Sequence, residues 1–181
     1  MKANIFAFLT ALLLLPVMFA GCNNANDDEL PEDKILPVLS NGKIETGGDG
    51  VLANEELTAF FEKYLPTLSG SQSECFFVGD KENKCLIINS ADELRKIISS
   101  SSVELPTIDF GSYTLVMGQH MIDGTAYRVV TQEIAVNSDK KELTLSVKKP
   151  DGTYTVICPV YYWGLYPKLT QEAIGVNLII L

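Results

Sequence analysis

Apolar and polar residues follow three successive patterns along this chain, and each predicts a different kind of structure. Ile5–Val17 is almost wholly apolar. This run is shorter than the roughly 18–20 residues with which a helix crosses a bilayer, so it is typical of a removable signal segment. Residues 22–50 are mostly polar and acidic, which predicts a flexible tether. From there on apolar positions recur with the periods of helices and strands, which predicts a single domain over residues 51–181.

Two short helices are predicted in the first half of this domain. Asn54 can cap the first helix, and Pro66 ends it. The segment SADE at 90–93 matches a capping box and opens the second helix. The inward-facing residues are Leu57, Phe60, Phe61 and Tyr64 with Leu65 in the first helix, and Leu94, Ile97 and Ile98 in the second.

Strands are predicted for most of the remaining domain. A hairpin is expected at about 75–79 and 85–89, on either side of a Gly-Asp turn. Beyond Pro106 the chain is rich in β-branched and aromatic residues, in segments that turn signals separate. The further strands expected are Tyr113–Met121, Thr125–Val136, Glu142–Lys148 and Thr153–Tyr162, with a final buried strand within 173–181. The predicted fold class is α+β, with short helices packed on an antiparallel, meander-like sheet.

The signal segment ends in a short motif, Phe19-Ala20-Gly21-Cys22. It resembles the lipobox of bacterial lipoproteins, with Phe19 where an aliphatic residue is usual. The resemblance implies that residues 1–21 are removed and that acyl chains on Cys22 anchor the protein to a membrane. Each buried CH₂ contributes roughly 0.8 kcal/mol, so two or more chains give stable anchoring. The alternative is an ordinary signal peptide with an incidental cysteine.

The charge of the chain narrows the choice of partners. The formal net charge is −9, which disfavours nucleic acid and electrostatic docking to anionic lipid. The segment NDDE at 26–29, shortly after Cys22, resembles the acidic export signal of Bacteroidetes surface lipoproteins. This implies a place in the cell envelope, at the outer membrane and on its outer face. A solvated acidic spacer is the alternative.

Three cysteines remain besides Cys22. Cys75 and Cys85 bracket the predicted hairpin, so a disulfide between them is predicted, with a stabilisation of about 2–3 kcal/mol. Cys158 lies in an apolar strand-like run and is predicted to be a buried free thiol. Because the chain has one histidine and no Cys-x-x-Cys pair, no zinc site is expected. No other metal and no cofactor is predicted either.

Two consecutive segments carry a family resemblance: LIINSADELRKII at 86–98 and LPTIDFGSYTLVMGQH at 105–120. They are similar to the C-terminal domain of PrcB-like proteins, named for a subunit that stabilises a spirochaete surface protease complex. In that family a strand leads into a Ser-capped helix, a Pro-x-(Val/Ile)-Asp-Phe segment and another strand. The next turn of the family is Thr-Gly-Gly-Tyr-like, whereas this chain has DGTAY at 123–127. The resemblance implies a non-catalytic interaction domain that touches a protease.

Asp109 and Phe110 of that segment also have a structural interpretation. Pro106 keeps Leu105 out of a helical conformation, so the chain approaches in an extended form. Asp109 can then accept backbone N–H bonds where the chain turns into the next strand, and Phe110 can pack into the core. A functional role for Asp109 is the alternative.

The densest group of aromatic residues is the segment YYWGLY at 161–166. Consecutive strand residues point to opposite faces, so these rings cannot all be buried on one side of a sheet. We therefore expect one or two exposed rings, which would anchor a protein partner or support sugar rings. The candidate binding residues are Tyr161, Tyr162, Trp163 and Tyr166. The alternative is a core tryptophan with tyrosines on an edge strand.

Catalysis has little support in the sequence. A Ser-His-Asp or Cys-His site would have to use His120, the only histidine, and no nucleophile motif accompanies it. The predicted function is therefore an envelope lipoprotein with a non-catalytic binding or accessory domain for a protein partner, such as a protease or an envelope complex. A carbohydrate-binding accessory lipoprotein of a glycan-uptake system is the first alternative, and a small envelope hydrolase using His120 is the second.

Overall fold

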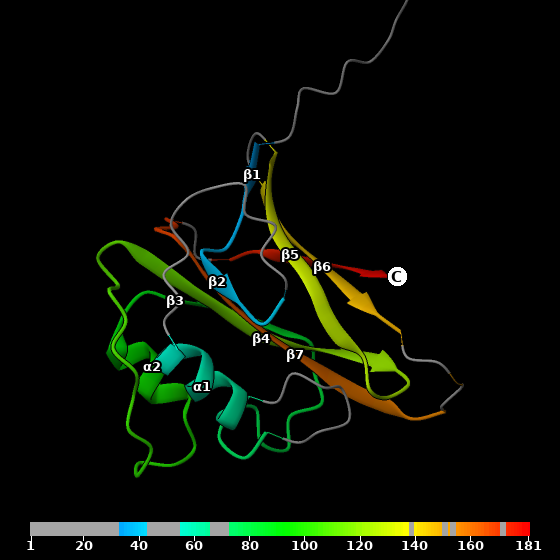
Figure 1. The fold of residues 1–181 in the computed structure, drawn as a ribbon, viewed down its shortest axis with the longest axis horizontal. Helices are drawn as coiled ribbons and strands as arrows, with labels where there is room; N and C mark the ends of the chain where they lie inside the picture. The colour runs from blue at the N-terminus through cyan, green and yellow to red at the C-terminus, as the bar shows by residue number, and fades with distance from the viewer. Residues whose placement is uncertain are drawn as a thin grey trace, which may run out of the picture. The chain divides into compact units, whose positions relative to one another are not determined.

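A computed structural model of the chain describes residues 33–42, 55–65, 73–137, 140–149, 152, 155–170 and 173–181. The chain from Pro31 onward forms one compact unit (Figure 1). The signal segment, Cys22 and Asn54 lie outside the described residues, so the hypotheses made for them stay predictions. Within the described part, none of the helices has the length and apolar character needed to cross a membrane.

The described strands form two four-stranded sheets. All neighbours in the first sheet are antiparallel, whereas β8 of the second sheet runs parallel to β6. The first, called here the central sheet, has the order β2 (Leu39–Ser40), β7 (Ile157–Pro167), β4 (Tyr113–Asp123), β3 (Lys84–Ile88). The second, called here the outer sheet, has the order β1 (Asp33–Ile35), β5 (Arg128–Asn137), β6 (Lys140–Lys148), β8 (Gly175–Ile180).

The central sheet is covered on both faces. On one face, Met117 of β4 and Trp163 of β7 share a buried cluster with residues of α1 (Glu55–Tyr64) and α2 (Ala91–Ile97). On the other face, Val116 of β4 and Tyr162 of β7 share a second cluster with β5 and β6. β4 and β7 are therefore nearly continuous apolar runs, as strands buried on both faces are.

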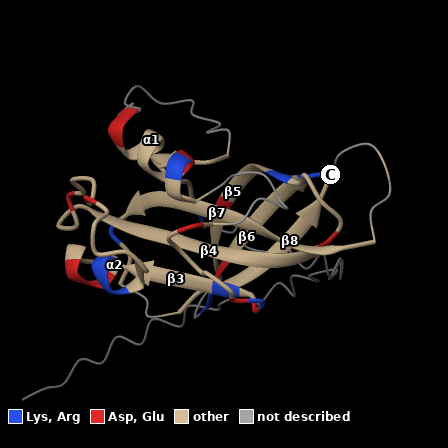
Figure 2. Cartoon of the chain, turned by 90° about the horizontal axis from the view of Figure 1, so that it is seen from below, with Lys and Arg blue, Asp and Glu red and all other residues tan. Residues whose placement is uncertain are grey.

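Both predicted helices are confirmed. Leu57, Phe60 and Phe61 of α1 are buried, as the helical period requires. A capping box forms at the start of α2, because Ser90 Oγ accepts a hydrogen bond from the Glu93 N–H at 3.2 Å. The Glu93 carboxylate reaches back to the Asn89 N–H, at 2.6 Å, rather than to that of Ser90. Acidic residues occupy the first turn of each helix and basic residues the last turn, which complements the helix dipole (Figure 2).

The prediction of one meander-like sheet is wrong, although the mixed content of short helices and mostly antiparallel strands is confirmed. The strands divide between two sheets because the rows of apolar residues on β4 and β7 need cover on both sides. The final strand is also not buried. β8 lies at the edge of the outer sheet, and Ile179 and Ile180 are exposed.

Two further boundaries differ from those predicted. The tether predicted over residues 22–50 includes β1 and β2, which pair with β5 and β7, so the folded region begins well before residue 51. The first strand of the predicted hairpin, at 75–79, does not form. Its central residue, Phe77, has a φ of 55°, which no extended strand can contain.

A buried glutamine explains why residues near Ser40 belong to the fold. Gln132 of β5 donates hydrogen bonds from Nε2 to Asn41 Oδ1 at 3.1 Å and to the Trp163 carbonyl at 2.9 Å. Asn41 in turn donates from Nδ2 to the Tyr161 carbonyl at 3.0 Å. Because buried polar groups need partners, Asn41 is required where the two sheets meet.

Candidate functional site

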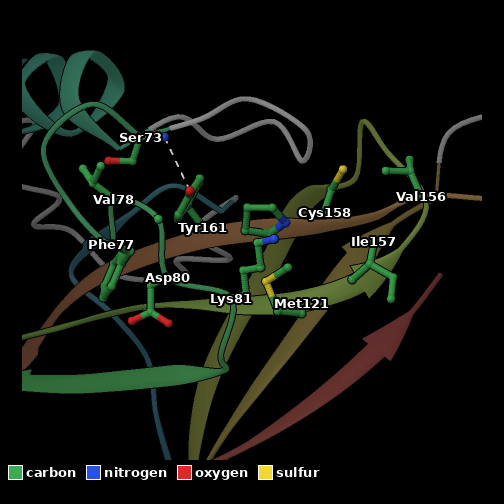
Figure 3. A pocket seen from close by; sticks show the side chains of 12 residues that line it. Ser73, Phe77, Val78, Asp80, Lys81, Met121, Val156, Ile157, Cys158 and Tyr161 are labelled. Carbon is green, nitrogen blue, oxygen red and sulfur yellow. Dashed lines mark hydrogen bonds between the residues drawn. The ribbon is translucent and has the colours of Figure 1, made fainter.

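An open cavity of about 770 Å³ lies where residues 73–81 cross the ends of β4 and β7 (Figure 3). We call it the β7 pocket. Met121 comes from β4, and the segment that enters β7 supplies the opposite wall. The lining consists of Ser73, Phe77, Val78, Gly79, Asp80, Lys81, Met121, Val156, Ile157, Cys158, Pro159 and Tyr161.

The walls of the β7 pocket are mostly apolar, and three of their large apolar side chains are exposed. Val78 is 62% exposed, Val156 44% and Ile157 64%. These are three of the seven large apolar side chains that are exposed in the described part of the chain. Single exposed apolar residues need no explanation, but their concentration around one cavity marks a surface that a partner can cover.

The loop that forms one wall is held in a strained conformation. Phe77 has a φ of 55°, which is rare for a bulky residue and is typically retained only where the surroundings enforce it. Its ring stacks on Tyr161 at a centroid distance of 6.2 Å and an interplanar angle of 14°. The strain therefore places an aromatic face at the cavity, and such strain concentrates at binding sites.

Ser73 fastens the beginning of the same loop. Its Oγ accepts a hydrogen bond from the Phe76 N–H at 2.8 Å and donates one to the Tyr64 carbonyl at 2.9 Å. Its N–H donates to Tyr161 Oη at 3.4 Å, the contact drawn in Figure 3. The wall is thereby tied to α1 and to β7.

The other end of the loop is fastened by polar contacts of β4 and β3. Buried Gln119 donates from Nε2 to the Asp80 carbonyl at 3.2 Å and to the Glu82 carbonyl at 2.8 Å. The Asp80 carboxylate forms an ion pair with Lys84 and accepts a hydrogen bond from the Glu82 N–H at 3.0 Å. The Lys84 ammonium and the neighbouring backbone N–H groups hold the pKa of Asp80 below its usual value.

The aromatic residues predicted to bind a partner are buried, so the expectation of exposed rings is wrong. Tyr161 contributes to the β7 pocket but is only 4% exposed. Tyr162 and Tyr166 fill the cluster between the sheets, and Trp163 stacks on Phe61 of α1 at 4.5 Å. The rings do point to opposite faces, as predicted, but both faces are covered, one by helices and the other by the outer sheet.

The predicted Cys75–Cys85 disulfide is also wrong, because both residues are free thiols. Cys75 is buried in the cluster with the helices, whereas Cys85 packs against the cluster between the sheets. The central sheet thus separates them. Cys158 is free as predicted, but it is half-buried rather than buried, and it lines the β7 pocket.

His120 lies outside the β7 pocket. It lines a separate cavity of about 290 Å³ together with Cys85. Burial lowers the pKa of His120 and raises that of the Cys85 thiol, so both groups favour their neutral forms. A Cys–His nucleophile needs the opposite, a thiolate beside an imidazolium. Among the described residues, no group of three or more His, Cys, Asp or Glu side chains could hold a metal ion.

The structural interpretation of Asp109 is confirmed. Its Oδ1 accepts hydrogen bonds from the N–H groups of Gly111 at 3.0 Å and Ser112 at 3.4 Å, immediately before β4. The Ser112 hydroxyl and these N–H groups lower the pKa of the carboxyl group. Phe110 packs against the cluster that contains the helices.

Sequence reasoning missed the residues that matter most at the β7 pocket. The pattern predicts Val78 within a strand that does not form, and it predicts Val156 and Ile157 within the body of a strand that begins only at Ile157. No local pattern marks Val78 as a neighbour of Val156 and Ile157, because Val156 follows Val78 by 78 positions in the sequence. The chain matches none of the protein families, curated proteins or solved structures with which it was compared.

Proposed function

We propose that this chain is a non-catalytic binding module whose β7 pocket receives apolar side chains of a protein partner. The observation that carries the proposal is the gathering of Val78, Val156 and Ile157 around one cavity. Covering such side chains contributes roughly 25 cal/mol for each Å² of apolar surface removed from water. The loop around Phe77 supports the proposal, because the hydrogen bonds of Ser73 and Gln119 hold that wall in place before any partner arrives.

A protein partner suits this surface better than an apolar small molecule. A site for a small molecule usually encloses most of its ligand. At the β7 pocket, by contrast, the rim residues Val78 and Ile157 are 62% and 64% exposed, so the rim itself faces water. A small molecule bound within the cavity would leave these rim side chains in contact with water. A protein segment can enter the cavity and cover the rim together.

The proposal also includes the location of the protein and the class of its partner. The Phe19–Cys22 motif supports an envelope lipoprotein anchored through acyl chains on Cys22, and the acidic segment Asn26–Glu29 supports a place on the outer face of the outer membrane. The similarity of residues 86–120 to PrcB-like domains supports a protease, or a complex containing one, as the partner. That similarity is what favours a protease over other envelope proteins.

Two observations favour the proposed function over the two alternatives. A glycan-binding platform relied on exposed rings at 161–166, and all four candidate rings are buried. A Cys-His hydrolase would use His120 with Cys85 of the same cavity, and burial raises the pKa of that thiol, which disfavours the thiolate form. Neither alternative explains the apolar rim of the β7 pocket.

A displayed library of random peptides tests the proposal even though the natural partner is unidentified. The full chain is immobilised, selected peptides are synthesised, and their dissociation constants are measured by isothermal titration calorimetry. The test variants are Val78→Ser and Ile157→Ser, which change exposed side chains and should leave the fold intact. The matched control is Ile179→Ser on β8, an exposed residue far along the sequence in the outer sheet.

We expect apolar peptides whose affinity falls about tenfold in each pocket variant and stays unchanged in Ile179→Ser. A tenfold loss corresponds to about 1.4 kcal/mol, which is reasonable for one exposed side chain that becomes covered. Circular dichroism of each variant establishes that it is folded. Selection of no peptide, or equal losses in Ile179→Ser and Ile157→Ser, would contradict the proposal.

A further inference from the structure

We infer that the protein segment bound in the β7 pocket carries an acidic residue beside its apolar side chains, and that Lys81 pairs with that carboxylate. This inference rests on the proposed function, because it concerns the chemistry of the same occupant. It is based on the charged side chains that line the pocket and on whether each of them already forms an ion pair.

Only two charged side chains line the β7 pocket among the described residues, Asp80 and Lys81. The Asp80 carboxylate is engaged by the Lys84 ammonium and by the Glu82 N–H. Figure 3 shows it turned away from Lys81. Asp80 is therefore not available to a partner, and it does not neutralise its neighbour.

Lys81 has no ionic partner in the described part of the chain. Within the part of the chain that the structure describes, no ion pair and no side-chain hydrogen bond engages it. Its side chain rises beside Met121 toward the β7 side of the cavity (Figure 3). Glu74 and Glu82 flank the loop in sequence, but neither lines the pocket. Among the described residues, the mouth of this mostly apolar cavity thus presents one ammonium group without an ionic partner.

When a partner segment binds, the Lys81 ammonium group affects which segments bind favourably. An apolar segment that covers the pocket removes water from Lys81, and an unpaired charge that loses its water is costly. A carboxylate on the segment offsets that cost and adds an ion pair. A purely apolar segment would leave the charge uncompensated, and a basic segment would add repulsion, so the pocket selects for acid next to apolar residues.

Long-range electrostatic attraction cannot account for the preference for an acidic segment. The chain has a net charge of −9, so its overall field repels acidic segments. The preference must then come from short-range contact with one cation, and removal of that cation should abolish it. This sets the effect apart from general electrostatic steering, which depends on total charge.

The test uses a peptide selected as above in two forms, one with its Asp or Glu and one with the matching Asn or Gln. Each form is titrated against the wild-type full chain and against Lys81→Gln, Lys81→Arg and the control Lys148→Gln. Lys148 is an exposed lysine of β6 that does not line the pocket, so the control makes the same change in net charge outside the pocket lining. Oleate is included as a competitor, because an apolar body with one carboxylate also describes a fatty acid.

We expect Lys81→Gln to weaken the acidic peptide about fivefold, the upper end of the range for one accessible ion pair. The amide form should bind at least as tightly as before, because no unpaired charge then loses its water. Lys81→Arg should retain binding and Lys148→Gln should have no effect. Equal losses for both peptide forms, or none for either while Ile157→Ser still weakens binding about tenfold, would overturn the inference and leave the proposed function standing. Binding of oleate without any peptide would overturn both.

Discussion

Gly118 of β4 lies directly beneath the hydroxyl group of Tyr162 on β7. That hydroxyl donates a hydrogen bond of 2.8 Å to the Lys84 carbonyl of β3, so one contact joins three neighbouring strands. A Cβ on residue 118 would overlap both the Tyr162 hydroxyl and the Lys84 carbonyl. The glycine is therefore what allows a large ring to lie flat across the central sheet.

Gly118→Ala should consequently lower the free energy of unfolding by about 1–3 kcal/mol, the usual cost of overpacking. The measurement is urea denaturation followed by circular dichroism. Gly175→Ala is the control, because the nearest atom to its added Cβ lies 4.0 Å away, on Glu142. Equal stability of Gly118→Ala and Gly175→Ala would show that the Tyr162 ring does not lie over Gly118.

Trp163 is the only tryptophan and is fully buried against Phe61. Its fluorescence should therefore be blue-shifted and poorly quenched by acrylamide in the native protein. Trp163→Ala should destabilise the fold by about 3–5 kcal/mol through loss of a large core side chain. A red-shifted, readily quenched native spectrum would contradict the burial and would restore Trp163 as a candidate binding residue.

The thiols should differ in reactivity. Native alkylation at pH 8, followed by mass spectrometry, should modify Cys158 first, because it lines an open cavity. Cys75 is buried, and burial raises the pKa of Cys85, so both should react mainly after denaturation. A pocket-binding peptide should slow labelling of Cys158. A Cys75–Cys85 cross-linked peptide in a non-reducing digest would contradict the arrangement of free thiols.

Asp109 should stabilise the fold in a pH-dependent way. Its folded-state pKa lies below the ordinary value of 3.8, so its contribution is present above that value and is lost as the pH falls through the lower folded-state value. Asp109→Asn should thus be less stable than wild type at pH 7, and the difference should shrink below pH 3.8. Urea denaturation across this range measures it, and a difference that is constant with pH would contradict the prediction.

The lipid anchor is tested separately from the pocket. The wild-type protein should partition into the detergent phase of a Triton X-114 extraction, and Cys22→Ala should move to the aqueous phase because it has no acyl chains. Protease treatment of intact cells then distinguishes surface exposure from a periplasmic location. Detergent partitioning of Cys22→Ala would overturn the lipoprotein proposal.

Several features could be predicted from the sequence because local chemistry decides them. The two helices follow from apolar residues at helical spacing, and the Ser90–Glu93 capping box forms as predicted. The turn before β4 follows from the short Asp109 side chain, which reaches only N–H groups a few residues away. Turn residues likewise indicated most of the strands, although not their ends.

The arrangement around β7 was decided by tertiary structure alone. The aromatic run at 161–166 correctly indicated rings on both faces of a strand, but no local signal tells whether one face or both are covered. Covering both faces buried the rings expected to bind, drew residues 33–42 into the sheets, and separated Cys75 from Cys85. The β7 pocket exists because two segments distant in sequence leave their apolar side chains beside one another, and such a meeting is a property of the packed chain.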